Sequence, residues 1–290
     1  MTYKKVLIAS ADSMGVDLIS HTKNLHSNYS RFQASGDGVF QFSNLAKIQD
    51  AFPVWPDLLS NKLSSKCINV SMPGIGNRAI YERCIKEVSK HNTSDIELVV
   101  VMWSEYFRVD IRTPGYSEYY RVHGKDPVPV PEIIFQENYL KQLPKMKTYE
   151  YLEMLVDINF TYIYGLQQFL KNQNINYLMI SGLNPVNDVD NLIKIGAALH
   201  PNWQKYLGEL MLKSHFYDLI DPERFIGFPG DQKLMGFSYC NYLASLDKEK
   251  TKTRLGWAFK SIGRPFDMHP NAYGHKLGAE LLYENYKKIN

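Results

Sequence analysis

Residues 5–15 read Lys-Val-Leu-Ile-Ala-Ser-Ala-Asp-Ser-Met-Gly. The apolar run is short, rich in branched residues and bounded by small and polar residues, which is typical of a buried parallel strand that ends in a turn. In open α/β sheets the ligand site lies beyond the carboxyl ends of the strands, so Ser13 would be well placed to act as a nucleophile. An Asp-Ser pair after a strand is also a common helix cap, and that alternative stays open for Asp12 and Ser13.

Further apolar runs predict three more strands, and segments with a helical period separate them. We expect strands over residues 5–11, 66–71, 96–103 and 176–182, and helices over 53–63, from 77 onward, over 148–172 and after 271. Strands that alternate with helices in this way favour a parallel sheet covered on both faces. Asn271 is a suitable N-cap for the last helix.

Two stretches lack a sustained period and are predicted to be loop-rich insertions in a single domain of residues 1–290. The first, residues 110–147, carries five prolines among many tyrosines and is interpreted as a lid over one end of the sheet. The second, residues 186–263, is expected to hold a helix near residues 203–214 and a short strand at 216–220. A short helix is also expected at residues 44–50.

The composition restricts the class of protein. Hydrophobic residues make up 44% of the chain and charged residues 22%, which is ordinary for a globular protein and excludes disordered and fibrous classes. The first apolar run is too short for a signal peptide and no run is long enough to span a bilayer, so we expect a soluble cytoplasmic protein without a membrane partner. The charge run at 247–254 mixes both signs, which favours a solvated face over a nucleic-acid patch.

The ends of the expected elements supply the groups that nucleophilic acyl transfer needs. A hydroxyl, a base, a group that orients the base and donors for the oxyanion are required. Ser13 would be the nucleophile, His269 the base and Asp267 the group that holds the imidazole tautomer. The backbone N–H groups of Ser13 and Gly74 would form the oxyanion hole. The structural alternatives are a helix-start histidine at 269 and a tight turn at 74.

No cofactor or metal is expected. Cys67, Cys84 and Cys240 are odd in number and widely spaced, which suits free thiols and gives no metal-ligand spacing. His269 and His275 lack a third ligand at a recognisable spacing. His275 is therefore interpreted as an orienting or packing residue. A nucleotide-binding Rossmann-type site is disfavoured because the first turn lacks the required glycine spacing.

Four blocks in chain order resemble the SGNH (GDSL-type) hydrolases. They are Asp12-Ser13, residues 69–74 (Asn-Val-Ser-Met-Pro-Gly), the polar turn at residues 103–106, and Asp267-Met268-His269-Pro270. The resemblance implies a flavodoxin-like three-layer α/β/α sandwich with a parallel central sheet, and ester hydrolysis without a metal. It also implies that Ser13 is the nucleophile, Gly74 the oxyanion glycine and His269 the base. The expected function is a serine esterase that hydrolyses a short acyl ester, such as an acetyl group on a small-molecule or carbohydrate substrate.

The chain departs from the family pattern at three places. Ala11 replaces the glycine before Asp-Ser, Asp267 lies two residues before the histidine rather than three, and Glu105 stands where the family has an asparagine. An ionised carboxylate cannot donate to an oxyanion. The candidates for a third donor or a substrate contact are therefore Asp12, Asn77, Ser104, Glu105 and Arg108. The alternative function is a catalytically weakened SGNH-like module that binds a glycan or a protein partner through its aromatic insertions.

Overall fold

The structure is a computed structural model of the 290-residue chain. It describes residues 5–16, 52–72, 75–104, 106, 109–112, 119–122, 148–182, 209–228, 238–240, 242, 243, 246 and 270–290. Only the backbone is described at Ser13, at residues 109–112 and 119–122, and at a few helix positions. The helix expected at residues 44–50 lies outside the described residues.

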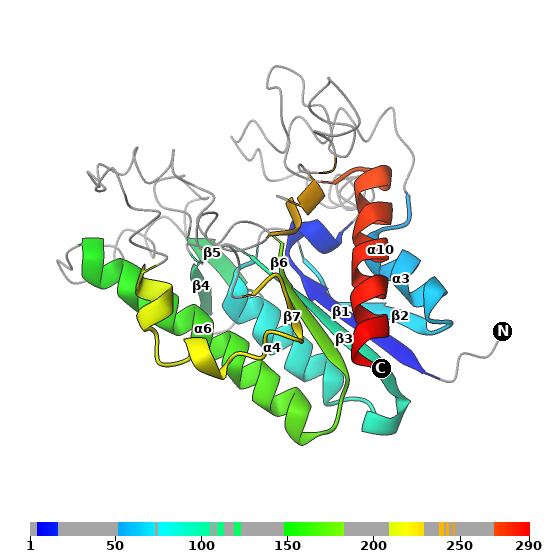
Figure 1. The fold of residues 1–290 in the computed structure, drawn as a ribbon, viewed down its shortest axis with the longest axis horizontal. Coiled ribbons are helices and arrows are strands. Elements are labelled where there is room, and N and C mark those ends of the chain that lie inside the picture. The colour runs from blue at the N-terminus through cyan, green and yellow to red at the C-terminus, as the bar shows by residue number, and fades with distance from the viewer. Residues whose placement is uncertain are drawn as a thin grey trace, which may run out of the picture.

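A five-stranded parallel sheet forms the centre of the fold (Figure 1). Its strands are β1 (Val6–Ala11), β2 (Lys66–Asn69), β3 (Ile96–Trp103), β6 (Tyr177–Ser181) and β7 (Phe225–Ile226). They lie in the order β2-β1-β3-β6-β7, and every neighbouring pair is parallel. Counted along the chain this is the order 2-1-3-4-5, the flavodoxin-like doubly wound arrangement, in which ligands bind where the order reverses. The place where the order reverses, called the switch point, lies between β1 and β3.

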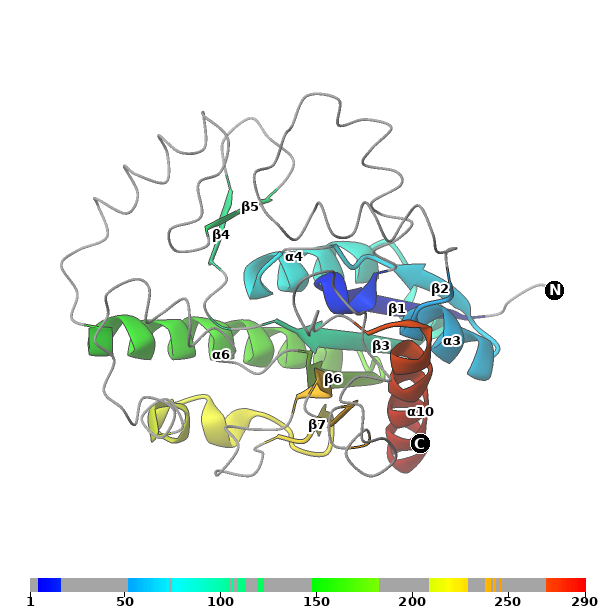
Figure 2. The same ribbon diagram turned by 90° about the horizontal axis from the view of Figure 1, so that it is seen from above.

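Helices cover both faces of the sheet (Figures 1 and 2). Alternate side chains of a strand point to opposite faces. In β3, Val99 and Val101 pack with α4 (Asn77–Val88) and α6 (Thr148–Asn172), whereas Val100 packs with α3 (Trp55–Lys62) and α10 (Ala272–Ile289). The predicted three-layer α/β/α sandwich with a parallel central sheet is therefore confirmed.

The prediction of a short strand at residues 216–220 is wrong. That segment contains a 3-10 turn, η3 (Tyr217–Leu219), and the fifth strand forms later as β7. The amide of Gln167 on α6 explains the difference, because it donates to Leu219 O at 2.7 Å and accepts from Asp221 N–H at 2.8 Å. Within the segment, the N–H groups of Tyr217, Leu219 and Ile220 donate to Ser214 O, Phe216 O and Tyr217 O, so these donors are used in the turn and not in a strand ladder.

The first insertion contains an antiparallel pair that the sequence analysis missed. Strands β4 (Val109–Arg112) and β5 (Tyr119–Val122) pair with each other and not with the central sheet. The remainder of the predicted lid lies outside the described residues.

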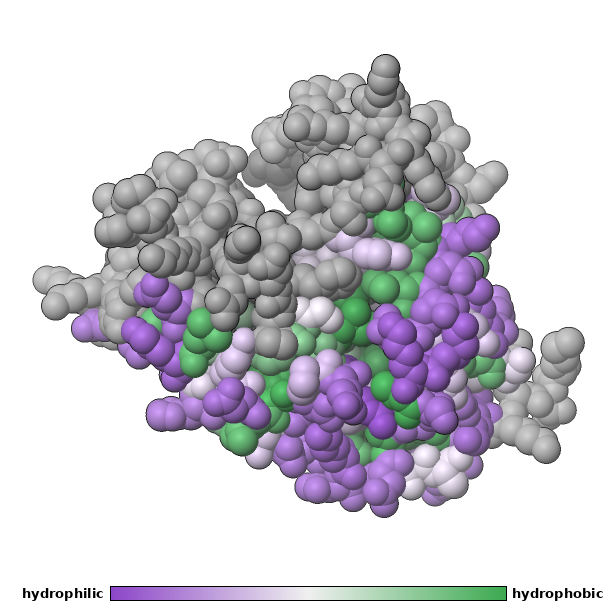
Figure 3. All heavy atoms as spheres, in the orientation of Figure 1, coloured by the Kyte–Doolittle hydropathy of each residue, from purple (hydrophilic) through white to green (hydrophobic). Residues whose placement is uncertain are grey.

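The surface seen from the side of Figure 1 is mixed in character. Figure 3 shows hydrophilic side chains over much of the described surface, with hydrophobic ones in separate patches between them. No helix among the described residues is both long enough and apolar enough to cross a membrane.

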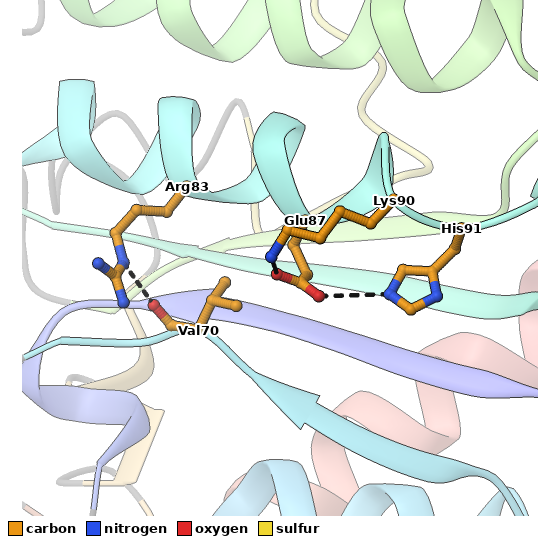
Figure 4. Close-up of polar contacts among 5 residues, drawn as sticks. All are labelled: Val70, Arg83, Glu87, Lys90 and His91. Atoms are coloured by element: carbon orange, nitrogen blue, oxygen red, sulfur yellow. Dashed lines mark hydrogen bonds and ion pairs between the residues drawn. The ribbon is translucent and has the colours of Figure 1, made fainter.

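Helix α4 is attached to the end of β2 and carries a charged cluster at its C-terminal end (Figure 4). The Arg83 guanidinium donates to Val70 O at 2.8 Å. One turn further along, the Glu87 carboxylate binds the Lys90 ammonium on one oxygen and His91 Nε2 on the other. Burial alone would raise the pKa of Glu87, but the hydrogen bonds and charges of Lys90 and His91 outweigh it and lower the pKa below its usual range.

We predict that Glu87→Gln lowers the unfolding free energy at neutral pH by up to about 1 kcal/mol, because it removes partly exposed ion pairs. A carboxyl with a lowered folded-state pKa stabilises the fold above its unfolded pKa, and this contribution disappears as pH falls through the folded pKa. Urea unfolding of both proteins between pH 7 and pH 2 measures this. The gap should close in acid; a gap of constant size would contradict the assignment.

Candidate active site at the carboxyl ends of β1 and β3

The chain leaves β1 through a 3-10 turn, η1 (Ser13–Gly15), that begins at Ser13. Asp12, which precedes it, is fully buried. Its carboxylate oxygen Oδ1 accepts the Met14 N–H at 2.9 Å, and its carbonyl accepts the Gly15 N–H at 3.2 Å. Asp12 therefore caps the turn, as the structural alternative for this residue proposed. The same contacts fix the backbone on both sides of Ser13.

Two further side chains bind the turn from neighbouring elements. The indole Nε1–H of Trp55 donates to Met14 O at 3.0 Å, and the amide of Asn69 donates to Gly15 O at 2.7 Å. A Cβ atom on Gly15 would overlap the side chains of Ser71 and Ala11, so only glycine allows the turn to approach the segment after β2 this closely. The turn that carries Ser13 is thus held by β1, β2 and α3 together.

A hydrogen bond joins the ends of β1 and β3 across the switch point. Ser104, the residue after β3, donates its hydroxyl to Asp12 Oδ2 at 2.8 Å. Ser104 is 1% exposed and Asp12 is fully buried. A buried carboxylate is costly unless its oxygens accept hydrogen bonds, and both Asp12 oxygens do so.

Asn77, the first residue of α4, fixes the backbone of Ser104. Its Oδ1 accepts the Ser104 N–H at 2.7 Å and its Nδ2 donates to Ser104 O at 3.0 Å. Nδ2 also donates to Asn159 Oδ1 at 2.7 Å. Both amide hydrogens of Asn77 are therefore engaged within the protein, and so is the hydroxyl hydrogen of Ser104. In this arrangement the two side chains hold neighbouring residues of the site, and neither has a free hydrogen to donate to an oxyanion.

Asn159 on α6 completes the network and was missed by the sequence analysis. Its Nδ2 donates to Leu155 O at 2.7 Å and to Tyr106 O at 3.2 Å, so it holds the turn after β3 at a second point. It is 3% exposed. The sequence does contain a signal: Asn159 falls midway between Leu155 and Ile163 at helical spacing, where an apolar residue is expected.

The structure brings four of the predicted site residues together: the backbone of Ser13 and the side chains of Asp12, Asn77 and Ser104. The other predicted residues, Gly74, Glu105, Arg108, Asp267 and His269, lie outside the described residues, so their roles stay predictions. The segment after His269 is described. Asn271 is the N-cap of α10, and its Oδ1 accepts the Gly274 N–H at 3.0 Å, as predicted.

His275 in the first turn of α10 is 1% exposed. Its Nδ1 accepts the backbone N–H of Trp55 at 3.2 Å, and its ring lies against Phe52 with the centroids 5.7 Å apart. The prediction that His275 is an orienting or packing residue is confirmed. Among the described residues, no group of three histidine, cysteine or acidic side chains is placed to hold a metal ion.

We predict that Asn77→Ala lowers the unfolding free energy by about 3 kcal/mol, because it leaves buried groups of Ser104 and Asn159 without partners. Urea denaturation of the two proteins measures the loss. Asn92→Ala is the matched control, since the Asn92 amide makes an exposed bond to Asp95; it should change stability by less than about 0.5 kcal/mol. Equal effects of the two substitutions would contradict the buried network.

Comparisons with known proteins give similarity in structure only. No family model and no curated protein matches the sequence. Among the solved structures, one that is similar is named "putative lipolytic protein of G-D-S-L family" and comes from Desulfitobacterium hafniense DCB-2. It is 10% identical, with a TM-score of 0.43, over 97% of this chain and 99% of that chain.

Proposed function

We propose that this protein is a serine ester hydrolase of the SGNH type. In the proposed reaction Ser13 Oγ attacks the ester carbonyl while His269 takes its proton, and Asp267 orients the imidazole. The N–H groups of Ser13 and Gly74 stabilise the tetrahedral oxyanion. His269 then gives the proton to the leaving alcohol. Water, activated by the same histidine, releases the acid and restores the serine.

The observation that carries this proposal is the position of the turn from Ser13 to Gly15. It follows β1 directly and lies at the switch point of a doubly wound sheet, where ligand sites of such sheets form. Its backbone is held by Asp12, Trp55 and Asn69. A nucleophile and an oxyanion donor on one rigid turn need little reorganisation during the reaction, which favours catalysis.

The buried network supports backbone rather than side-chain stabilisation of the oxyanion. Asn77 and Ser104 use their hydrogens inside the protein. The proposed hole therefore consists of the two backbone donors. Because the loss of one donor costs about a hundred- to a thousandfold in rate, we propose a modest rate and an activated or short acyl ester as substrate, such as an acetyl ester of a carbohydrate.

The engagement of the Asn77 and Ser104 hydrogens inside the protein also favours a second candidate function. If Glu105 supplies no donor either, the site belongs to a catalytically weakened SGNH-like module. Such a module would bind a glycan or a protein partner instead of turning over an ester. Hydrolysis by the purified protein separates the two candidates.

The test is hydrolysis of an aryl acetate by the wild type, Ser13→Ala and His269→Ala. The wild-type rate should rise with pH through a histidine-like pKa, because only the neutral imidazole accepts the proton. Each substitution should lower kcat by about 10³-fold or more, since the residues of such a site act as a unit. Circular dichroism confirms that the three proteins are folded. Equal rates in all three would refute the esterase proposal and favour the binding module.

A further inference from the structure

We propose that Trp55 is a positioning residue that ties the turn bearing Ser13 to the segment bearing His269. This inference rests on the proposed function, because it assigns Trp55 to the alignment of that nucleophile and that base. Trp55 is fully buried, so it acts through its neighbours and does not contact a substrate.

Trp55 has two N–H donors, and they bind Met14 and His275, which follow the proposed nucleophile and the proposed base in the sequence. The indole Nε1–H donates to Met14 O at 3.0 Å, one residue after Ser13. The backbone N–H donates to His275 Nδ1 at 3.2 Å, six residues after His269. These bonds span 41 and 220 residues of sequence. Trp55 thus joins the turn after β1 to the first turn of α10.

The local chemistry of α3 explains why a histidine is used for this contact. Trp55 is the first residue of α3, and an N–H in the first turn of a helix has no acceptor within the helix. In a buried position such a donor needs a partner from elsewhere. The imidazole nitrogen of His275 provides it. Because Nδ1 accepts this hydrogen bond, the ring is the neutral tautomer with its proton on Nε2.

Two hydrogen bonds to Gly274 hold the first turn of α10 in place. The hydroxyl of Tyr239, a fully buried residue, donates to Gly274 O at 2.8 Å, and Asn271 Oδ1 accepts the Gly274 N–H. A Cβ atom at Gly278 would overlap the Tyr239 ring, so glycine is required for this close approach. Pro270 leads into the helix and directly follows His269, with φ restricted by its ring. A shift of α10 at His275 would therefore move the start of this helix, and Pro270 there is the neighbour of the proposed base in the sequence.

Alignment of this kind has a large kinetic effect and a small effect on binding. A nucleophile and a base must lie within hydrogen-bond reach of each other, and a misplacement of about 1 Å costs on the order of a hundredfold in rate. Trp55 makes no contact with a substrate. Its loss should accordingly appear in kcat rather than in KM.

The first experiment compares Trp55→Phe with Leu59→Ala in aryl acetate hydrolysis. Both residues lie on α3 and are fully buried, but the Leu59 side chain makes no hydrogen bond. Trp55→Phe should lower kcat about 10-fold or more with KM changed less than about threefold. Leu59→Ala removes core packing alone and should stay within about twofold of the wild-type kcat. Equal losses of kcat would mean that only core packing matters, and would overturn the proposal.

The second experiment tests the other bond. In His275→Asn the side-chain oxygen takes the place of Nδ1 as an acceptor, whereas His275→Leu offers no acceptor. We expect kcat of His275→Asn to exceed that of His275→Leu by about fivefold or more. Urea midpoints of the variants are measured in parallel, and kinetics are recorded well below them. Equal kcat values of these two variants would contradict a role for the bond.

The third experiment asks whether Trp55 acts through His269. In a His269→Ala background, Trp55→Phe should leave the residual rate unchanged, because there is no longer a base to align. A further loss equal to that seen in the wild-type background would overturn the inference. An inert wild type would refute the proposed function and this inference with it. An active wild type with equal losses in Trp55→Phe and Leu59→Ala would refute this inference alone.

Discussion

The hydrogen bond from the Ser104 hydroxyl to the Asp12 carboxylate joins the two strands at whose ends the site is built. A fully buried carboxylate tolerates only a well-bonded environment, so the turns after β1 and β3 are restricted to an arrangement that serves both of its oxygens. Asn77 extends the constraint to α4 and Asn159 extends it to α6. One connected hydrogen-bond network therefore lies at the carboxyl ends of β1 and β3; its members are Asp12, Ser104, Asn77 and Asn159.

The regular parts of the fold were predictable because their signals are local and repeated. Residues 96–103 and 148–172 were predicted with the bounds that β3 and α6 have, since eight apolar-rich residues and seven helical turns leave little choice. Short elements gave no such signal. The strand at 225–226 has two residues, and the competing segment at 216–220 forms a turn whose end is bound by the amide of Gln167, which is distant in sequence.

The residues of the candidate site likewise fall into two groups: those whose role is predictable from the local sequence, and those whose role is not. Asp12 and Asn271 cap turns that lie within three residues of them, and such caps follow recognisable patterns. Trp55 and Asn159 act over 41 residues or more, on Met14 and on Tyr106, and no periodicity names a partner at that distance. Burial also changed the interpretation of Asn77. In the sequence it is a candidate donor for an oxyanion, whereas in the structure its hydrogens serve Ser104 and Asn159.

We propose above all that Ser13 is a nucleophile, placed at the switch point of the sheet and activated by a base. The most direct measurement is reaction of the full chain with a fluorophosphonate probe, followed by mass spectrometry of the labelled peptide. The account predicts a single phosphonylated residue, Ser13, among the 290 residues, with labelling abolished by heat denaturation. Labelling at another serine, or no labelling of the folded protein while a control serine hydrolase reacts, would contradict it.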